Sequence, residues 1–145
     1  MKSTLVFWDN EENSKRGTKR GLAIFPIYII LTLLWFFLTK KSIYSKHIDT
    51  VNNYRLIVSL FVTGVLIVSA VAVHTPSTAQ KAIVYGASVG FVVYGIANAV
   101  LLATSNKWGY VISIIDTSWG IVSTALISYL LYEIVKLAPG VFKVM

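Results

Sequence analysis

The chain has 145 residues, of which 56% are hydrophobic and only 13% are charged. This composition is too apolar for an ordinary soluble domain of that length and indicates a membrane protein. A net charge of +7 would suit nucleic acid, but the cations lie between apolar runs without a base-reading module, so we expect no nucleic acid partner. The absence of Cys excludes disulfides, thiolate metal sites and Cys nucleophiles.

The first element in chain order is a polar N-terminal tail, residues 1–20, which precedes a charge-free run over residues 21–39. At about 1.5 Å per residue this run matches a hydrocarbon core of about 30 Å, so it predicts the first transmembrane helix. The flanking cations are expected to contact anionic lipid headgroups. They are Lys15, Arg16, Lys19, Arg20, Lys40 and Lys41.

Three further apolar runs follow. They predict spans over residues 56–73, 82–103 and 109–132. Together the four runs predict an all-α, polytopic membrane protein: a four-transmembrane-helix bundle over residues 21–136 with a short C-terminal tail, residues 137–145. An even number of spans puts both termini on one side. That side carries more of the Lys and Arg residues, so we expect both termini to be cytoplasmic.

Small residues recur along one face of the third span, where every fourth position from 86 to 98 forms a stripe that includes a Gly-x-x-x-Gly step. Small residues let two helix backbones approach closely. The residues expected at helix contacts are Gly86, Gly90, Tyr94, Trp119 and Gly120. We favour packing within one chain over homodimerisation, because a four-helix bundle has many internal contacts to make. Ile112 is the expected lipid-facing residue of the fourth span.

Asp116 is the acidic residue that lies well inside a span, where burying its charge is costly. Counted from the helix ends, Thr32, Asn98 and Asp116 all lie roughly 8–11 Å below the same membrane surface. The sequence therefore predicts an intramembrane polar cluster of these three residues. One interpretation is a protonated carboxyl that makes interhelical hydrogen bonds, and the other is a proton or ion site.

Other chemistry has little support in the sequence. His47 and His74 fall in loops on opposite sides of the membrane, so they cannot share a metal or complete a triad with Asp116. Phosphate-binding loops and nucleophile elbows are absent. We therefore expect no metal, no cofactor and no enzymatic activity. Trp35 and Trp108 lie near predicted span boundaries, where an interfacial aromatic belt accounts for them.

Three segments carry a resemblance to a known family. They run from Leu31 to Tyr44, from Tyr94 through Ala103-Thr104 to Trp108, and over Asp116-Thr-Ser-Trp119-Gly120. They resemble domain-of-unknown-function family 2177, which comprises small membrane proteins with four predicted spans in bacteria and some large DNA viruses. The Asp-x-x-Trp-Gly element is the most specific part. The second span lies outside the resemblance.

The departures from the family pattern bear on function. The family pattern in the first span resembles Leu-Asp-x-x-Trp, and this chain has Thr32 in place of the Asp. In the third span the family pattern has an Asp and an Asn at the positions where this chain has Asn98 and Leu101. A site that needs several carboxylates should not survive this loss, whereas a hydrogen-bonded packing cluster would. We therefore favour a structural role for Asp116.

These patterns lead us to expect a non-enzymatic structural or assembly protein that anchors protein partners to a membrane. We expect the bilayer to carry anionic headgroups, and a homo-oligomer is one possible form of the assembly. The resemblance implies a virion internal-membrane or capsid-anchoring component as a specific case. The alternative function is a small proton- or ion-coupled transporter or channel subunit that uses Asp116.

Overall fold

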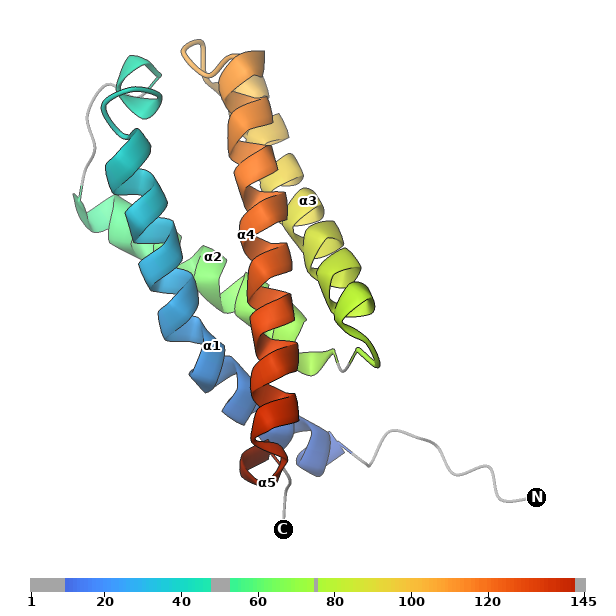
Figure 1. Ribbon diagram of the computed structural model, residues 1–145. Coiled ribbons are helices and arrows are strands. Elements are labelled where there is room, and N and C mark those ends of the chain that lie inside the picture. Colours follow the sequence, from blue (N-terminus) through green and yellow to red (C-terminus); the bar gives the residue numbers. More distant parts are fainter. Residues whose placement is uncertain (1–9, 48–52, 75, 143–145) are drawn as a thin grey trace.

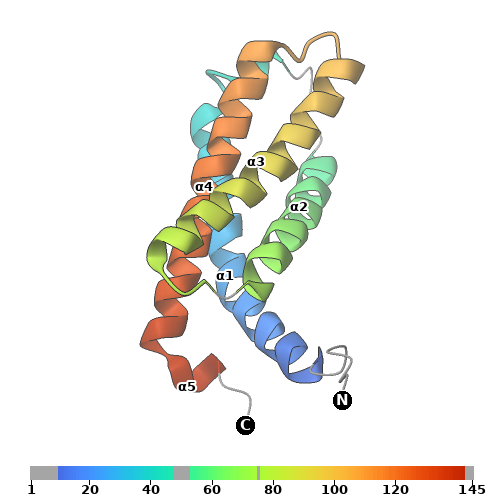
Figure 2. The same ribbon diagram turned by 90° about the vertical axis from the view of Figure 1, so that its right-hand side faces the viewer.

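The computed structural model describes residues 10–47, 53–74 and 76–142, and its regular elements are all helical. In chain order they are α1 (Asn10–Thr39), η1 (Tyr44–Lys46), α2 (Asn53–Val73), α3 (Ala79–Thr104), α4 (Tyr110–Leu137) and α5 (Pro139–Phe142). Helix α4 lies between α1 and α3, with α2 behind it (Figure 1). Helix α5 and the start of α1 lie together at one end of the bundle, which we call the α5 end (Figure 1, Figure 2). The opposite end holds η1 and the α3–α4 turn, and we call it the η1 end. The predicted all-α fold is confirmed.

Three helical segments within the described residues are long and apolar enough to cross a membrane: Ser14–Thr39, Ala79–Thr104 and Tyr110–Leu137. Helix α2 is the shortest of the four main helices, with 21 residues that extend over about 31 Å at the helical rise. Because a hydrocarbon core is about 30 Å thick, α2 is just long enough to cross it. The bundle thus has three long helices and one short one.

Helix α1 begins well before the run that hydropathy marks. Residues 10–20, which we expected in a polar tail, form its first turns. The reason is that Glu, Lys and Arg favour helices, whereas hydropathy reports a preference for lipid and not helicity. The other residues of the two predicted tails, 1–9 and 143–145, lie outside the described residues, as do residues 48–52 of the first loop.

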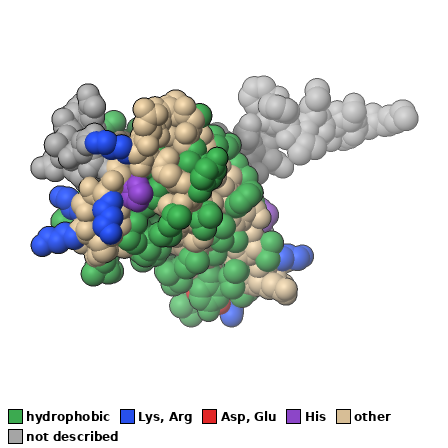
Figure 3. Space-filling view, turned by 90° about the horizontal axis from the view of Figure 1, so that it is seen from above, with side chains coloured by type: hydrophobic (Ala, Val, Ile, Leu, Met, Phe, Trp, Pro, Cys, Tyr) green, Lys and Arg blue, Asp and Glu red, His purple; other side chains and the backbone are tan. Residues whose placement is uncertain are grey.

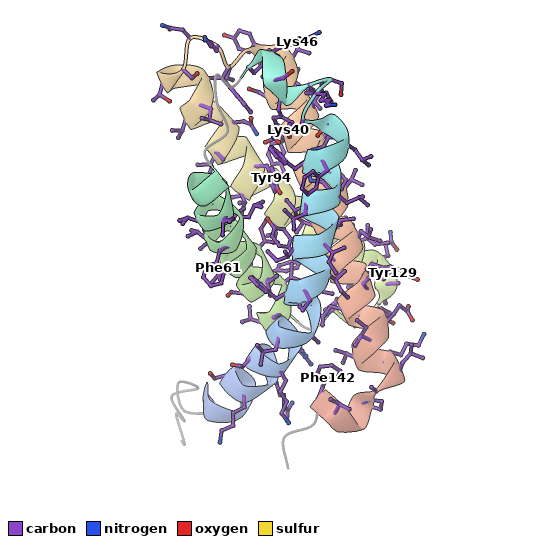
Figure 4. The ribbon with its side chains drawn as sticks, turned by 90° about the vertical axis from the view of Figure 1, so that its left-hand side faces the viewer. Lys40, Lys46, Phe61, Tyr94, Tyr129 and Phe142 are labelled. Carbon is purple, nitrogen blue, oxygen red and sulfur yellow. The ribbon has the colours of Figure 1, made fainter. Side chains whose placement is uncertain are left out.

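Helix α3 packs on α4 over the most extensive contact in the fold. A Cβ atom added at Gly86 would lie 2.5 Å from the carbonyl oxygen of Thr124, and one at Gly90 would overlap the carbonyl of Gly120. A Cβ atom at Gly120 would in turn overlap the Tyr94 ring, and Figure 4 shows Tyr94 in the interior of the bundle. The predicted small-residue face therefore packs within one chain, as the sequence favoured.

A buried apolar cluster joins α1, α2 and α4 from the middle of the bundle toward the α5 end. Its members are Ile24, Tyr28, Ile67, Val68, Val71, Ala72, Ile127 and Leu131. A smaller cluster at the η1 end contains Tyr44, Trp108 and Ile112. Because Ile112 has 0% of its surface exposed, the prediction that it faces lipid is wrong. Hydropathy cannot separate core from lipid, since both favour apolar side chains; the neighbouring Val111 is the exposed one.

Large apolar side chains cover the outside of the bundle. They include Leu22, Ile30, Phe37, Phe61, Phe91, Ile96, Ile114 and Val122. Phe61, labelled in Figure 4, is exposed over much of its surface while one edge of its ring contacts Phe25 of α1. A soluble monomer rarely exposes a continuous apolar surface of this extent. The exterior therefore fits contact with lipid tails.

Candidate functional site

Asp116 lies near the start of α4, within two turns of the η1 end, and its side chain is partly buried. Its Oδ1 atom accepts a hydrogen bond from the Tyr44 hydroxyl at 2.5 Å. Its Oδ2 atom accepts one from the Asn98 side-chain amide at 2.9 Å. Each carboxyl oxygen is therefore held by a neutral donor from a different segment, which satisfies the group without a cation.

Asn98 on α3 is almost fully buried and connects Asp116 to the rest of the site. Its amide nitrogen also donates to the hydroxyl of Thr117 at 3.2 Å and to the carbonyl of Tyr94 at 2.9 Å. Its carbonyl oxygen accepts a hydrogen bond from the Trp108 indole at 2.9 Å. Both ends of this amide are thus satisfied, as a buried polar group requires.

Tyr44 follows the end of α1 and is buried against aromatic rings. While its hydroxyl donates to Asp116, it accepts a hydrogen bond from the Trp35 indole at 3.1 Å. Trp35 also stacks on Trp119 of α4, with ring centroids 4.3 Å apart and nearly parallel planes. Burial first, and then the carboxylate of Asp116, raise the pKa of Tyr44 above its usual value, so the phenol keeps the proton that it donates.

These side chains form one connected network at the η1 end, which we call the Asp116 network. Its members are Trp35, Tyr44, Asn98, Trp108, Asp116 and Thr117. They come from α1, η1, α3, the α3–α4 turn and α4. The network therefore ties together segments that are far apart in the sequence.

Of the three residues predicted to cluster, the structure brings Asn98 and Asp116 into contact but not Thr32. The hydroxyl of Thr32 is buried and makes no hydrogen bond to the described residues. Depth along a helix can be counted from a sequence, but the direction in which a residue faces depends on packing. Thr32 is therefore not hydrogen-bonded to Asn98 or Asp116, and its predicted depth stays a prediction.

The sequence interpretation missed Tyr44, Trp35 and Trp108 as members of this site. We expected the two tryptophans in an interfacial belt, yet both indole N–H groups donate within the Asp116 network. Apolar periodicity does not show how the loop after α1 folds back onto α4. A usable signal was present, because all three residues lie in the segments that carry the family resemblance.

The predicted headgroup contacts differ in exposure. The exposed members are Lys15, Lys19, Lys40 and Lys41, and Arg16 is half-buried. Figure 3, which looks onto the η1 end, shows Lys and Arg side chains gathered on one side of this face. Arg20 differs, because it exposes only 9% of its surface. Arg20 is buried because α1 continues past it and it lies one turn before Ile24 on the packed face, and its contact with a headgroup stays a prediction.

The donor set of the Asp116 network does not resemble a metal site. In the part of the chain that the structure describes, no three His, Cys, Asp or Glu side chains come together. The carboxylate of Asp116 is surrounded by an amide, a phenol and indoles, and these groups are hydrogen-bond donors and not metal ligands. The chemistry that this arrangement offers is therefore hydrogen bonding between helices.

The long apolar helices and the apolar exterior together define a polytopic helical membrane protein. The family described as "Predicted membrane protein (DUF2177)" matches residues 19–132, and the chain belongs to this family. The match covers every member of the Asp116 network and confirms the resemblance drawn from the sequence. No curated protein and no solved structure matches the chain at a significant level.

Proposed function

We propose that this protein is a non-enzymatic structural component of a membrane and anchors partner proteins to the bilayer. The observation that carries this proposal is the hydrogen bonding of Asp116, whose two oxygens are held by Tyr44 and Asn98. Hydrogen bonds to a charged group contribute about 1.5–3 kcal/mol each. A carboxyl held in this way braces α4 against η1 and α3 and is poorly suited to carry protons between two sides.

A braced bundle suits the task of holding other proteins at a membrane. The η1 end presents exposed cations at Lys40, Lys41 and Lys46, which fit anionic headgroups or acidic partner surfaces. The partners in this proposal are protein subunits of a larger assembly, and a second copy of the chain is one such partner. Both termini then face the cytoplasm. The family resemblance adds a virion internal membrane, with a capsid-anchoring role, as a specific case.

A small proton- or ion-coupled transporter or channel subunit is the second candidate function. Asp116 favours it, because the residue lies within a membrane-crossing helix, where carboxylates commonly mark ion or proton pathways. The replacement of two family carboxylates by Thr32 and Asn98 weighs against it. A proton relay in this site would have to use Asp116 and Tyr44, and Tyr44 retains its proton.

Partner capture and ion flux distinguish the two functions. The variants are Asp116→Asn, which cannot titrate, and Ser118→Asn, a control with an exposed side chain on the same helix. If the structural proposal holds, cross-linked native membranes yield a stoichiometric protein partner with wild type and both variants. Liposomes that contain any of the three then pass no more protons than protein-free liposomes.

Two results would contradict the structural function. One is the absence of any stoichiometric partner. The other is a wild-type proton flux that disappears in a well-folded Asp116→Asn protein and persists in Ser118→Asn.

A further inference from the structure

A pocket of about 240 Å³ lies between α1, α2 and α4 toward the α5 end, away from the Asp116 network. The three helices converge in this region in Figure 1. Its lining includes Arg20, Val71, His74, Leu131, Val135 and Lys136. The pocket therefore joins cationic side chains to an apolar wall.

Arg20 is the cation in this pocket to which the described residues supply no counterion. It exposes 9% of its surface, and its Nε atom is buried without a hydrogen-bond partner in the described residues. The charge that acts on it is the like charge of Arg16, one helical turn away. A buried charge without a partner is costly. An anion that the described residues do not provide would offset this cost.

The two other ionisable side chains at the pocket, Lys136 and His74, have contacts of their own. The Lys136 ammonium lies 3.9 Å from the carboxylate of Glu133. The His74 ring stacks on Tyr85 at a centroid distance of 3.9 Å and is exposed at the rim. Arg20 is therefore the group in this pocket best placed to take an external anion.

The position of Arg20 along α1 indicates which anion is at hand. Arg20 directly precedes the charge-free run that begins at Gly21, so it lies where the hydrocarbon core meets the headgroups. Phospholipid phosphates lie at this level, and basic pockets between membrane helices bind such headgroups. Next to Arg20, Val71, Leu131 and Val135 supply the apolar wall that a lipid also needs.

We propose that this pocket binds one anionic phospholipid, whose phosphate pairs with Arg20 and whose glycerol and first acyl carbons contact the apolar wall. This site is independent of the Asp116 network and of the anchoring function. It differs from the general attraction of exposed lysines to anionic headgroups, because it is a single site that holds one lipid.

Thermal unfolding in two lipids tests the proposal. Wild type is compared with Arg20→Met, which keeps an unbranched stem, in nanodiscs of phosphatidylcholine and of phosphatidylglycerol. The control is Lys81→Met, which removes an exposed cation from the first turns of α3. In phosphatidylcholine the phosphate charge is balanced by the lipid's own choline, so we expect Arg20→Met to melt at or above the wild-type temperature, because it removes a buried charge that this lipid neutralises poorly. In phosphatidylglycerol the order should reverse, while Lys81→Met follows wild type in both lipids.

Native mass spectrometry supplies a second measurement with a variant that keeps every charge. Val135→Phe fills the pocket, and we expect both it and Arg20→Met to retain bound phosphatidylglycerol at least tenfold less than wild type. Inorganic phosphate should not raise the wild-type melting temperature. Equal lipid retention in wild type and both variants overturns the proposal. A phosphate effect as large as that of the lipid overturns the lipid assignment.

Discussion

The carboxylate of Asp116 connects a tyrosine and an asparagine that are 72 and 18 residues away in sequence. Asp116→Asn keeps the size of the side chain and one acceptor, so we expect a loss of about 1 kcal/mol in unfolding free energy. Asp116→Leu leaves the Tyr44 hydroxyl and the Asn98 amide with an acceptor missing, at about 1–3 kcal/mol for each. Unfolding in mixed micelles measures both. An equal loss in the two variants would contradict a hydrogen-bonding role.

Tyr44 makes the pH dependence of this network testable. Its pKa is raised above the ordinary 10.0 by burial and by Asp116, so the folded state holds this proton more tightly than the unfolded state. The stabilisation from Tyr44 is then complete below about pH 10 and is lost as the pH rises through the higher folded pKa. We expect Tyr44→Phe to cost about 1–3 kcal/mol at pH 7, and the gap to wild type to narrow above pH 10.

The control for this prediction is Tyr110→Phe, because Tyr110 is 78% exposed. Its unfolding free energy should match wild type at every pH. A gap between Tyr44→Phe and wild type that stays constant from pH 7 to pH 11 would mean that the Tyr44 proton is not linked to folding.

The sequence predicted part of this network and missed part of it, for identifiable reasons. The pairing of Asn98 with Asp116 follows from counting the helical rise, which is nearly the same in every helix. The exclusion of Thr32 and the entry of Tyr44 depend on helix rotation and on the fold of a short turn. Those features are fixed by tertiary packing, which hydropathy does not record.

At the scale of elements, the α3–α4 interface is where small residues are required. A methyl group at Gly90 would meet the backbone of Gly120 and Ile121, which cannot move aside as a flexible side chain can. We expect Gly90→Ala to destabilise the bundle by about 1–3 kcal/mol, the usual range for overpacking. A methyl group at Gly95 on the same helix would meet nothing within 4 Å, so Gly95→Ala is the matched control.

The Gly95→Ala control should equal or slightly exceed wild type, because Ala favours helix over Gly. Thermal unfolding of the two variants in one detergent decides the matter. Identical melting temperatures for Gly90→Ala and Gly95→Ala would show that α3 and α4 are not in close contact.

The extent of the helices shows what hydropathy can and cannot predict. The α3 run and the start of the α4 run were placed close to their observed bounds, because polar turns interrupt the apolar sequence there. The end of α4 was placed too early, at residue 132, because Glu133 and Lys136 are charged yet helical. Helix α1 was placed too short, since its first turns are polar yet helical. Ile112 was placed on the wrong face, because core and lipid both accept an isoleucine.

At the scale of the whole molecule, the two ends of the bundle differ in chemistry. The η1 end closes around the Asp116 network, in which acceptors and donors are matched. The α5 end carries the buried Arg20 beside a pocket, and the residues that the structure describes supply no counterion for it. The first end can therefore fix the relative positions of the helices, while the second is suited to bind an anionic lipid.

Topology is the whole-molecule property that an experiment can test most directly, and the short α2 makes the test informative. The chain contains no Cys, and Ser14, Ser42 and Ser77 are exposed near helix ends. If α1 and α2 both cross the bilayer, Cys at positions 14 and 77 reacts with an impermeant maleimide from one side and Cys at position 42 from the other. The excess of Lys and Arg on the side of Ser14 predicts that the cytoplasmic label reacts at positions 14 and 77. Helix α2 is the shortest of the four main helices. If it does not cross, positions 42 and 77 lie on one side. Labelling of both from that side would contradict the four-span topology and leave α2 at the membrane surface.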